Sequence, residues 1–357
     1  MGAVYYGGGN DTDFLEGCDI TNEISPFAPL NEMMYTVIEN SESDFNAIMM
    51  RAGVRELAYV EENHMEMIYE DGKIKKLVDD VTGWFKKVWE RIKEMINKAL
   101  DAMAKKSVEF RKKILDKMNK DFLRKRLANV ASDKNFGTSY EYGDIGSKSA
   151  SFLSSIGNAD IKIIRIGEEA QKKSKNGETD TSGIETDLKV AMQSCFSGIG
   201  VKQNGIEFSQ ANYKKLLMSA MRGEPITVNG DKVKNNFNDW LDEVSSFPKT
   251  KRDLKKSYNE AKKSINEAIK KIHSYDTSKF FEASIFTKIV KYMKELRQIT
   301  IVCEQCVISC VNEREAFYRS VIIKVIGTKP VKESADWDND YFSESSTNDT
   351  VAAMFNW

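Results

Sequence analysis

The chain has 357 residues, of which 41% are hydrophobic and 30% charged, with 53 basic against 54 acidic side chains, as is typical of a soluble folded protein. Its two histidines, His64 and His273, leave little imidazole for catalysis or zinc binding. No apolar run approaches the roughly 20 residues that a membrane-spanning helix needs.

The near-zero net charge conceals four charged blocks. Residues 1–80 carry 17 acidic against 5 basic side chains, whereas residues 81–128 carry 15 basic against 6 acidic ones. Residues 249–275 carry 9 basic against 3 acidic side chains, and the last 27 residues carry 6 acidic ones against Lys332 alone. Such blocks either dock on oppositely charged partners or on the chain itself, or they are solvated helix faces.

Residues 1–77 are expected to form an acidic arm followed by short helices. Three consecutive glycines at residues 7–9, together with Pro26 and Pro29, oppose regular structure in the first 30 residues. Apolar side chains are too sparse there to build a core, so we expect aromatic rings of the arm to bind a partner. These candidate partner-binding residues are Tyr5, Tyr6, Phe14 and Phe27.

Residues 78–130 are predicted to form a long basic amphipathic helix. Apolar residues recur every three or four positions, and Lys and Arg fill the other faces. The lysines that surround Trp84, Phe85 and Trp89 resemble those of a helix that faces a membrane or a nucleic acid, which makes these three rings candidate partner-binding residues. Alternatively, the rings pack inward and the acidic first 80 residues balance the positive charge.

Residues 131–235 are predicted to form a small α+β unit. It begins in a polar loop over residues 129–150, and the β-branched run Ile161–Ile166 is typical of a strand. Short helices are expected at residues 183–196 and 209–221. The dipeptide Asn229-Gly230 is typical of a type I′ turn, which predicts a hairpin of residues 225–228 and 232–233.

Residues 236–327 are predicted to form a helical hairpin, and residues 328–357 an acidic tail. The hairpin consists of a basic helix over 249–275 and a second helix over 280–326, both with apolar residues at helical spacing. Aromatic rings set among acids in the tail are expected to bind neighbouring molecules. They are Trp337, Tyr341, Phe355 and Trp357.

Three cysteines of the second hairpin helix, Cys303, Cys306 and Cys310, lie on its apolar stripe. A structural zinc site needs a fourth ligand, so we expect buried thiols and no metal. The glycine triplet lacks the Gly-Lys-Ser/Thr sequence of a phosphate-binding loop, and no serine, histidine and aspartate stand in a catalytic spacing. The sequence therefore predicts a non-enzymatic protein, with no catalytic residue, cofactor or metal.

The order of these segments is similar to that of a known class of viral proteins. An arm containing YYGGG precedes the basic helix VTGWFKKVWERIKEMINKALDAMAKKSVEFRKKILDKM, and the last long helix contains VCEQCVISCVNEREAFYRSVI. In residues 1–125 and 280–326 the chain resembles internal head, or virion structural, proteins of large tailed bacteriophages. The resemblance implies many copies inside a capsid, between the shell and the DNA, without catalytic residues.

We therefore expect a mostly α-helical protein with long helices, a helical hairpin and a small α+β insert, acting as a structural component of a bacteriophage virion. It would fold in the host cytoplasm and mediate assembly contacts in the capsid interior. Its partners would be other virion proteins, with nucleic acid contacts open to the basic helices and no membrane partner expected. The alternatives are a membrane-active or host-interacting protein that uses residues 84–106, and an enzyme whose site the sequence does not reveal.

Overall fold

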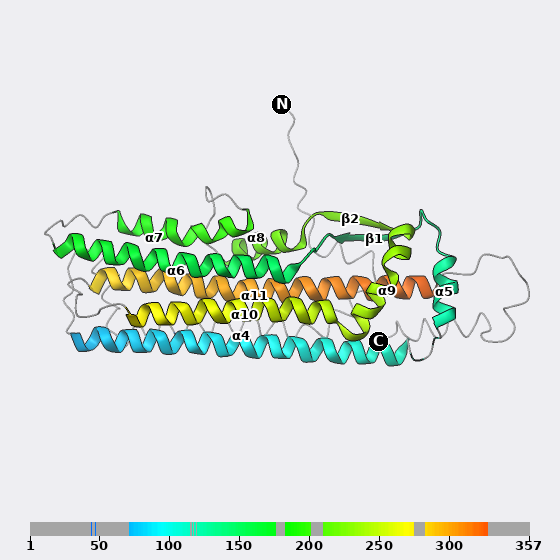
Figure 1. Cartoon of the computed structure of the whole chain (residues 1–357), viewed down its shortest axis with the longest axis horizontal. Helices are drawn as coiled ribbons and strands as arrows, with labels where there is room; N and C mark the ends of the chain where they lie inside the picture. Colours follow the sequence, from blue (N-terminus) through cyan, green and yellow to red (C-terminus); the bar gives the residue numbers. More distant parts are fainter. Residues whose placement is uncertain are drawn as a thin grey trace, which may run out of the picture.

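The computed structural model describes residues 71–114, 120–175, 183–200, 210–274 and 283–327, together with Asp44, Ala47, Asp116 and Met118. These residues form an elongated bundle of helices with one two-stranded sheet (Figure 1). The elements in chain order are α4 (Asp71–Lys113), α5 (Lys120–Ala128), β1 (Asn135–Tyr140), α6 (Ile145–Lys175), α7 (Ile184–Gln193), the 3-10 helix η3 (Ser194–Ile199), α8 (Gln210–Arg222), β2 (Pro225–Asn229), α9 (Gly230–Ser246), α10 (Pro248–Ser274) and α11 (Ala283–Ile326). The predicted fold class is confirmed.

The predicted basic helix is present as α4, but it ends before residue 130. Its 43 residues span about 65 Å at 1.5 Å per residue. Buried residues recur every three or four positions from Leu77 to Phe110, so that one stripe faces the bundle. Ile114, just after α4, and Leu123, in the separate helix α5, both belong to the core at one end of the molecule.

The strand predicted at Ile161–Ile166 is wrong, because this run lies within the 31-residue helix α6. Buried residues of α6 follow helical spacing, but several are small or polar, such as Gly146 and Ser149. A Cβ atom at Gly146 would lie 2.7 Å from the Cα atom of Asp253, so α6 and α10 approach each other closely there. Because α6 packs extensively on α10 and α11, residues 131–235 do not form a separate unit.

The hairpin predicted around Asn229-Gly230 is also wrong, although β2 itself is present. β2 pairs antiparallel with β1, from Asn135 opposite Asn229 to Tyr140 opposite Pro225. Asn229 has an extended backbone (φ −97°), and its side chain accepts a hydrogen bond from the backbone nitrogen of Lys232 at 3.0 Å. This is helix N-capping, which asparagine also favours. The polar segment over 129–150, predicted as a loop, contributes β1 and the start of α6.

The predicted short helices at 183–196 and 209–221 are confirmed as α7 with η3 and as α8, and the C-terminal hairpin as α10 and α11. Asp253 lies opposite Arg314 and Ser257 opposite Glu304, which shows that α10 and α11 run antiparallel. Figure 1 shows α11 running through the middle of the bundle. None of the helices described has the length and apolarity needed to cross a membrane.

Two hydrophobic clusters follow one another along the bundle. The larger one joins α4, α6, α7, α8 and α10 to the first two thirds of α11, up to Val311. The smaller one joins α5, β1, β2 and α9 to the last turns of α11, from Val321. α11 passes through both clusters, and the stretch between them carries Arg314, Glu315 and Arg319.

Candidate functional site

Strongly perturbed ionisable side chains line α11 inside the bundle. Between Ile285 and Val311 nearly every side chain of this helix is buried, and the set includes charged residues. Burying a charge costs free energy unless the charge is neutralised or paired. The partners of these residues therefore show what each buried group does.

Arg297, which has no exposed surface, connects α11 to α6 and α4. Its Nη2 donates a hydrogen bond to Oδ2 of Asp160, and its guanidinium carbon lies 5.3 Å from the ring centroid of Phe85. Burial raises the pKa of Asp160 to about 6, and the charge of Arg297 opposes that shift. The pair holds three helices together at one level of the bundle.

Glu304, seven residues further along α11, faces α10. The hydroxyl of Ser257 donates a hydrogen bond to its Oε1 at 2.9 Å. Burial raises the pKa of Glu304 to about 8, and the Ser257 hydrogen bond opposes the shift. Glu304 is therefore mainly protonated at neutral pH, and this level of the core carries a neutral carboxylic acid.

A group of buried polar residues separates the two hydrophobic clusters, and we call it the polar belt. Its members are Glu243, Thr250, Asp253, Arg314, Glu315 and Arg319. Arg314 donates to Asp253 Oδ2 at 2.8 Å and to Thr250 Oγ1 at 3.0 Å, and lies 3.6 Å from Glu243. Arg319 donates to Glu315 at 2.7 Å. The belt joins α9, α10 and α11 where α9 ends and α10 begins.

Glu243 fixes that junction between α9 and α10. Its two carboxylate oxygens accept hydrogen bonds from the backbone nitrogens of Lys249 and Thr250, both at 2.8 Å. These are orphan donors at the start of α10, a position that favours a negative charge. Phe247, between the helices, has a left-handed backbone (φ 43°), which turns the chain from α9 into α10.

Perturbed pKa values often mark active sites, but this network has the geometry of a structural one. Asp160, Glu243 and Asp253 are each enclosed by the bundle and face an arginine of α11. No group of His, Cys, Asp and Glu among the described residues is arranged to hold a metal ion. The buried charges are therefore best explained as contacts that set the register of α11 against α6 and α10.

Two of the three candidate partner-binding residues of α4 are not available to a partner. Trp84 and Phe85 are 1% and 0% exposed, and their ring centroids lie 5.5 Å apart inside the larger cluster. Trp89 is half-buried, and its ring centroid lies 4.6 Å from that of Tyr258 on α10. The inward-packing interpretation is therefore confirmed, and assignment of Trp84 and Phe85 to a partner surface is wrong. The structure places them together because they share the buried face of α4.

The other candidate partner-binding residues lie outside the described residues. They are Tyr5, Tyr6, Phe14, Phe27, Trp337, Tyr341, Phe355 and Trp357. The helix expected between residues 31 and 67 is described at Asp44 and Ala47 alone. The role of these eight aromatic residues in binding neighbouring molecules stays a prediction.

The burial predicted for three cysteines is confirmed. Cys303, Cys306 and Cys310 have no exposed surface, and burial raises the pKa of each thiol. The Sγ of Cys310 lies 3.8 Å from the Sδ of Met218 on α8. The thiols thus pack as small apolar groups between α11 and its neighbours.

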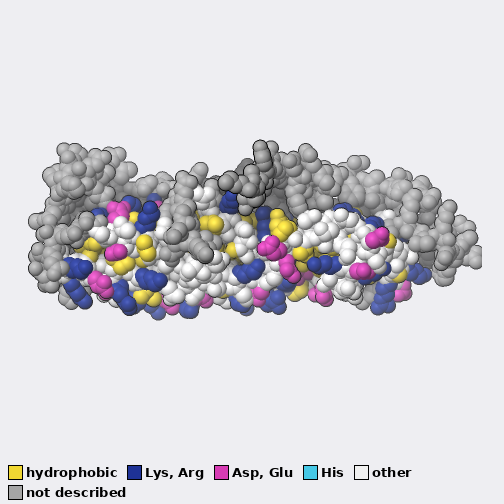
Figure 2. Space-filling view, turned by 90° about the horizontal axis from the view of Figure 1, so that it is seen from above, with side chains coloured by type: hydrophobic (Ala, Val, Ile, Leu, Met, Phe, Trp, Pro, Cys, Tyr) yellow, Lys and Arg dark blue, Asp and Glu magenta, His cyan; other side chains and the backbone are white. Residues whose placement is uncertain are grey.

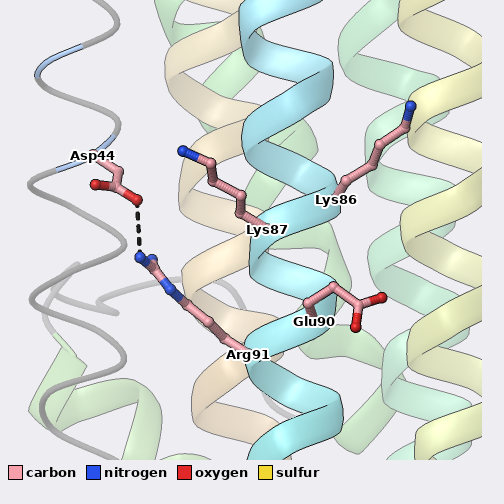
Figure 3. Close-up of a pocket in the computed structure, with 5 residues that line it drawn as sticks. All are labelled: Asp44, Lys86, Lys87, Glu90 and Arg91. Carbon is pink, nitrogen blue, oxygen red and sulfur yellow. Dashed lines mark hydrogen bonds and ion pairs between the residues drawn. The ribbon is translucent and has the colours of Figure 1, made fainter.

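An open depression on the surface of α4 is lined by Asp44, Lys86, Lys87, Glu90 and Arg91. Arg91 donates a hydrogen bond to Asp44 at 2.8 Å. Figure 3 shows that Lys87 and Arg91 point to one side of α4, whereas Lys86 and Glu90 point to the other. Because these side chains diverge, they do not converge on a common ligand.

The solvent face of α10 carries mainly basic side chains. Eight exposed residues of this face form what we call the α10 stripe. They are Lys251, Arg252, Lys255, Asn259, Lys262, Lys263, Asn266 and Lys270. It contains no carboxylate. By contrast, basic and acidic side chains are intermixed on the face seen from above in Figure 2. The sequence indicated a basic helix here, but not which of its cations lack an acidic neighbour.

The functional interpretation rests on the geometry described above, because comparisons with known proteins found no match. No family model, no curated protein and no solved structure matches the chain.

Proposed function

We propose that this chain is a non-enzymatic structural component of a tailed-bacteriophage particle, located in the capsid interior. The observation that carries the proposal is the central helix α11, which is enclosed along most of its 44 residues and joined by buried polar contacts to α4, α6 and α10. Such an arrangement favours one rigid, elongated body over a fold that opens around a substrate. The resemblance of residues 1–125 and 280–326 to virion proteins supports the particle as its place.

The structure does not favour the membrane-surface alternative. A helix that binds a bilayer needs its large apolar side chains on the exposed face. On α4 those side chains are Trp84 and Phe85, which fill the core. Releasing them would leave a gap between α4 and α11.

The proposal is tested on purified particles of the virus that encodes the chain. Intact particles are treated with protease and nuclease, washed and analysed by quantitative mass spectrometry, with the major shell protein as the reference for copy number. We expect peptides from residues 71–327 in many copies per particle, protected from protease until the capsid is opened. Absence of the chain from particles, or its removal by protease from intact ones, would contradict the proposal.

A further inference from the structure

We propose that the α10 stripe binds the phosphate backbone of double-stranded nucleic acid, without sequence preference. This inference concerns the surface of the folded chain and does not depend on the particle proposal. It rests on the placement, pairing and chemical type of the exposed side chains of one straight helix.

The acidic residues of α10 lie along one edge of the helix, beside the stripe. Asp253 is buried against Gly146 of α6, and a Cβ atom at Gly157 of α6 would lie 3.7 Å from a carboxylate oxygen of Glu267. Glu260 is paired with Lys263 at 3.3 Å. The rest of the solvent face presents a row of cations and asparagine amides, and the exposed Glu267 lies at its edge.

The row has the dimensions of a contact with a straight polyanion. From Lys251 to Lys270 the helix rises about 29 Å at 1.5 Å per residue. Duplex DNA carries one negative charge per roughly 1.7 Å of its axis, so a stretch of that length carries about 17 phosphates, part of which face the helix. A helix suits a duplex because only side chains, and neither backbone, have to be ordered on binding.

Three lysines of the stripe have no carboxylate partner among the described residues, unlike Lys263 of the stripe and two exposed lysines of α4. No carboxylate oxygen lies within 4.0 Å of the side-chain nitrogen of Lys255, Lys262 or Lys270 in the described structure. On α4, Lys93 lies 3.2 Å from Glu90 and Lys98 lies 2.6 Å from Glu94. Unpaired like charges on one face repel each other, and a bound polyanion removes that repulsion.

The chemical composition of the stripe favours backbone contacts over base contacts. Proteins that bind single strands present exposed aromatic rings for base stacking, and the stripe has none. The neighbouring ring of Tyr258 is half-buried and lies against Trp89. Lysine and asparagine contacts to phosphates position a duplex but do not read its sequence.

The test compares two triple variants of the full chain with equal net charge. The first is Lys255→Gln with Lys262→Gln and Lys270→Gln, which removes three unpaired cations of the stripe. The control is Lys93→Gln with Lys98→Gln and Lys291→Gln, which removes three exposed lysines that are each within 3.2 Å of a carboxylate. Circular dichroism confirms that both variants keep the helical content of the original chain.

Binding is measured by fluorescence anisotropy with a labelled 25-base-pair duplex of mixed sequence at 50–200 mM KCl. Each phosphate contact contributes about −0.9 to the slope of log affinity against log salt concentration. We expect the stripe variant to lose at least about tenfold in affinity at 50 mM KCl and to have a slope shallower by about 2.7, because three contacts are gone. The control should stay within about twofold of the original chain at the same slope.

Four results would overturn the proposal. They are no duplex binding by the original chain at 50 mM KCl, equal losses in the two triple variants, tighter binding of a single strand than of the duplex, and displacement of the duplex by poly-L-glutamate at equal charge concentration. The last result would identify an acidic polypeptide, such as the acidic segments of this chain, as the occupant. The mass spectrometry of particles answers a separate question, so failure of one test is distinguishable from failure of the other.

Discussion

The two helices of the C-terminal hairpin, α10 and α11, use charged residues in opposite ways. α11 encloses Arg297, Glu304 and Arg314 in the bundle, where each has a hydrogen-bond partner on another helix. α10 exposes Lys255, Lys262 and Lys270 to solvent, with no carboxylate oxygen of the described residues within 4.0 Å of their side-chain nitrogens. The difference shows that a charged residue in a helix identifies neither a surface nor a site until its partners are known.

Buried charges and exposed charges also differ in what their removal costs. Breaking a buried pair leaves an uncompensated charge inside the protein, whereas an exposed cation loses little. A buried pair also permits few alternative arrangements of the helices that carry it. Mutations in α10 and α11 can therefore separate residues that maintain the fold from residues that serve binding.

The largest effect is expected for Arg314→Met. Methionine has a similar length but no charge, so Asp253 and Glu243 would stay buried without their shared cation. We expect the free energy of unfolding to fall by about 3–5 kcal/mol, as measured by urea denaturation. The matched change on the exposed helix, Lys262→Met, should alter it by no more than about 0.5 kcal/mol. Equal stability of the two variants would show that the polar belt does not support the junction.

Trp84→Ala is expected to destabilise the chain by about 3–5 kcal/mol, because truncating a large buried ring leaves a cavity. Its control is Lys86→Ala on the exposed face of the same helix, which should change stability by no more than about 0.5 kcal/mol. Both are measured by urea denaturation monitored by circular dichroism. Unchanged stability together with lost binding to anionic vesicles would instead support a membrane role for α4.

A pH effect is expected from Glu304, whose pKa burial raises to about 8 from an ordinary value of 4.5. Between these values the unfolded chain has released this proton while the folded chain retains it. The contribution of Glu304 to the free energy of unfolding should therefore be largest below pH 4.5 and fall with rising pH, by up to about 1.4 kcal/mol per unit, until about pH 8.

Glu304→Gln isolates this effect, because glutamine keeps an acceptor for Ser257 but does not titrate. Urea denaturation at pH 6.5, 7.0 and 7.5 should show the original chain losing about 1 kcal/mol relative to the variant over this range. Asp160, whose pKa is about 6, is present in both chains and cancels in the comparison. Parallel pH profiles of the two chains would mean that Glu304 keeps one protonation state throughout.

The same contrast explains which parts of the fold follow from sequence. α4, α10 and most of α11 are long helices with strong apolar periodicity, so their existence could be predicted. Ile161–Ile166 is a short β-branched run that fits either a strand or a buried helix. Because several buried residues of α6 are small or polar, the helical spacing of its apolar residues is not apparent in the sequence. The positions of the buried charges could not be predicted, because Arg297 and its partner Asp160 are 137 residues apart.

The candidate surface could be predicted only in part for a related reason. The excess of basic residues over 249–275 is visible in the sequence, as is that of α4. On α4, Lys93 and Lys98 have glutamates three and four residues away on the same face. On α10, Glu260 pairs with Lys263 three residues away, whereas Asp253 and Glu267 lie on the edge next to α6. The exposed faces of α4 and α10 can therefore be distinguished only when the orientation of each helix in the bundle is known.

The smallest effect is expected for Lys255→Glu, which tests whether an unpaired cation of α10 serves binding or folding. Lys251 and Arg252 precede this position by four and three residues, so a glutamate there would replace like-charge repulsion by attraction. Pairs at these spacings change helix stability by about 0.2–0.5 kcal/mol, so the variant should be slightly more stable than the original chain in 20 mM salt. The gain should vanish in 500 mM salt, where exposed charges are screened. Urea denaturation at both salt concentrations measures this difference, and the duplex-binding assay measures affinity of the same variant. A gain in stability together with a loss of affinity would mean that the unpaired cations of α10 serve binding rather than folding, whereas a loss of stability would mean that Lys255 supports the bundle itself.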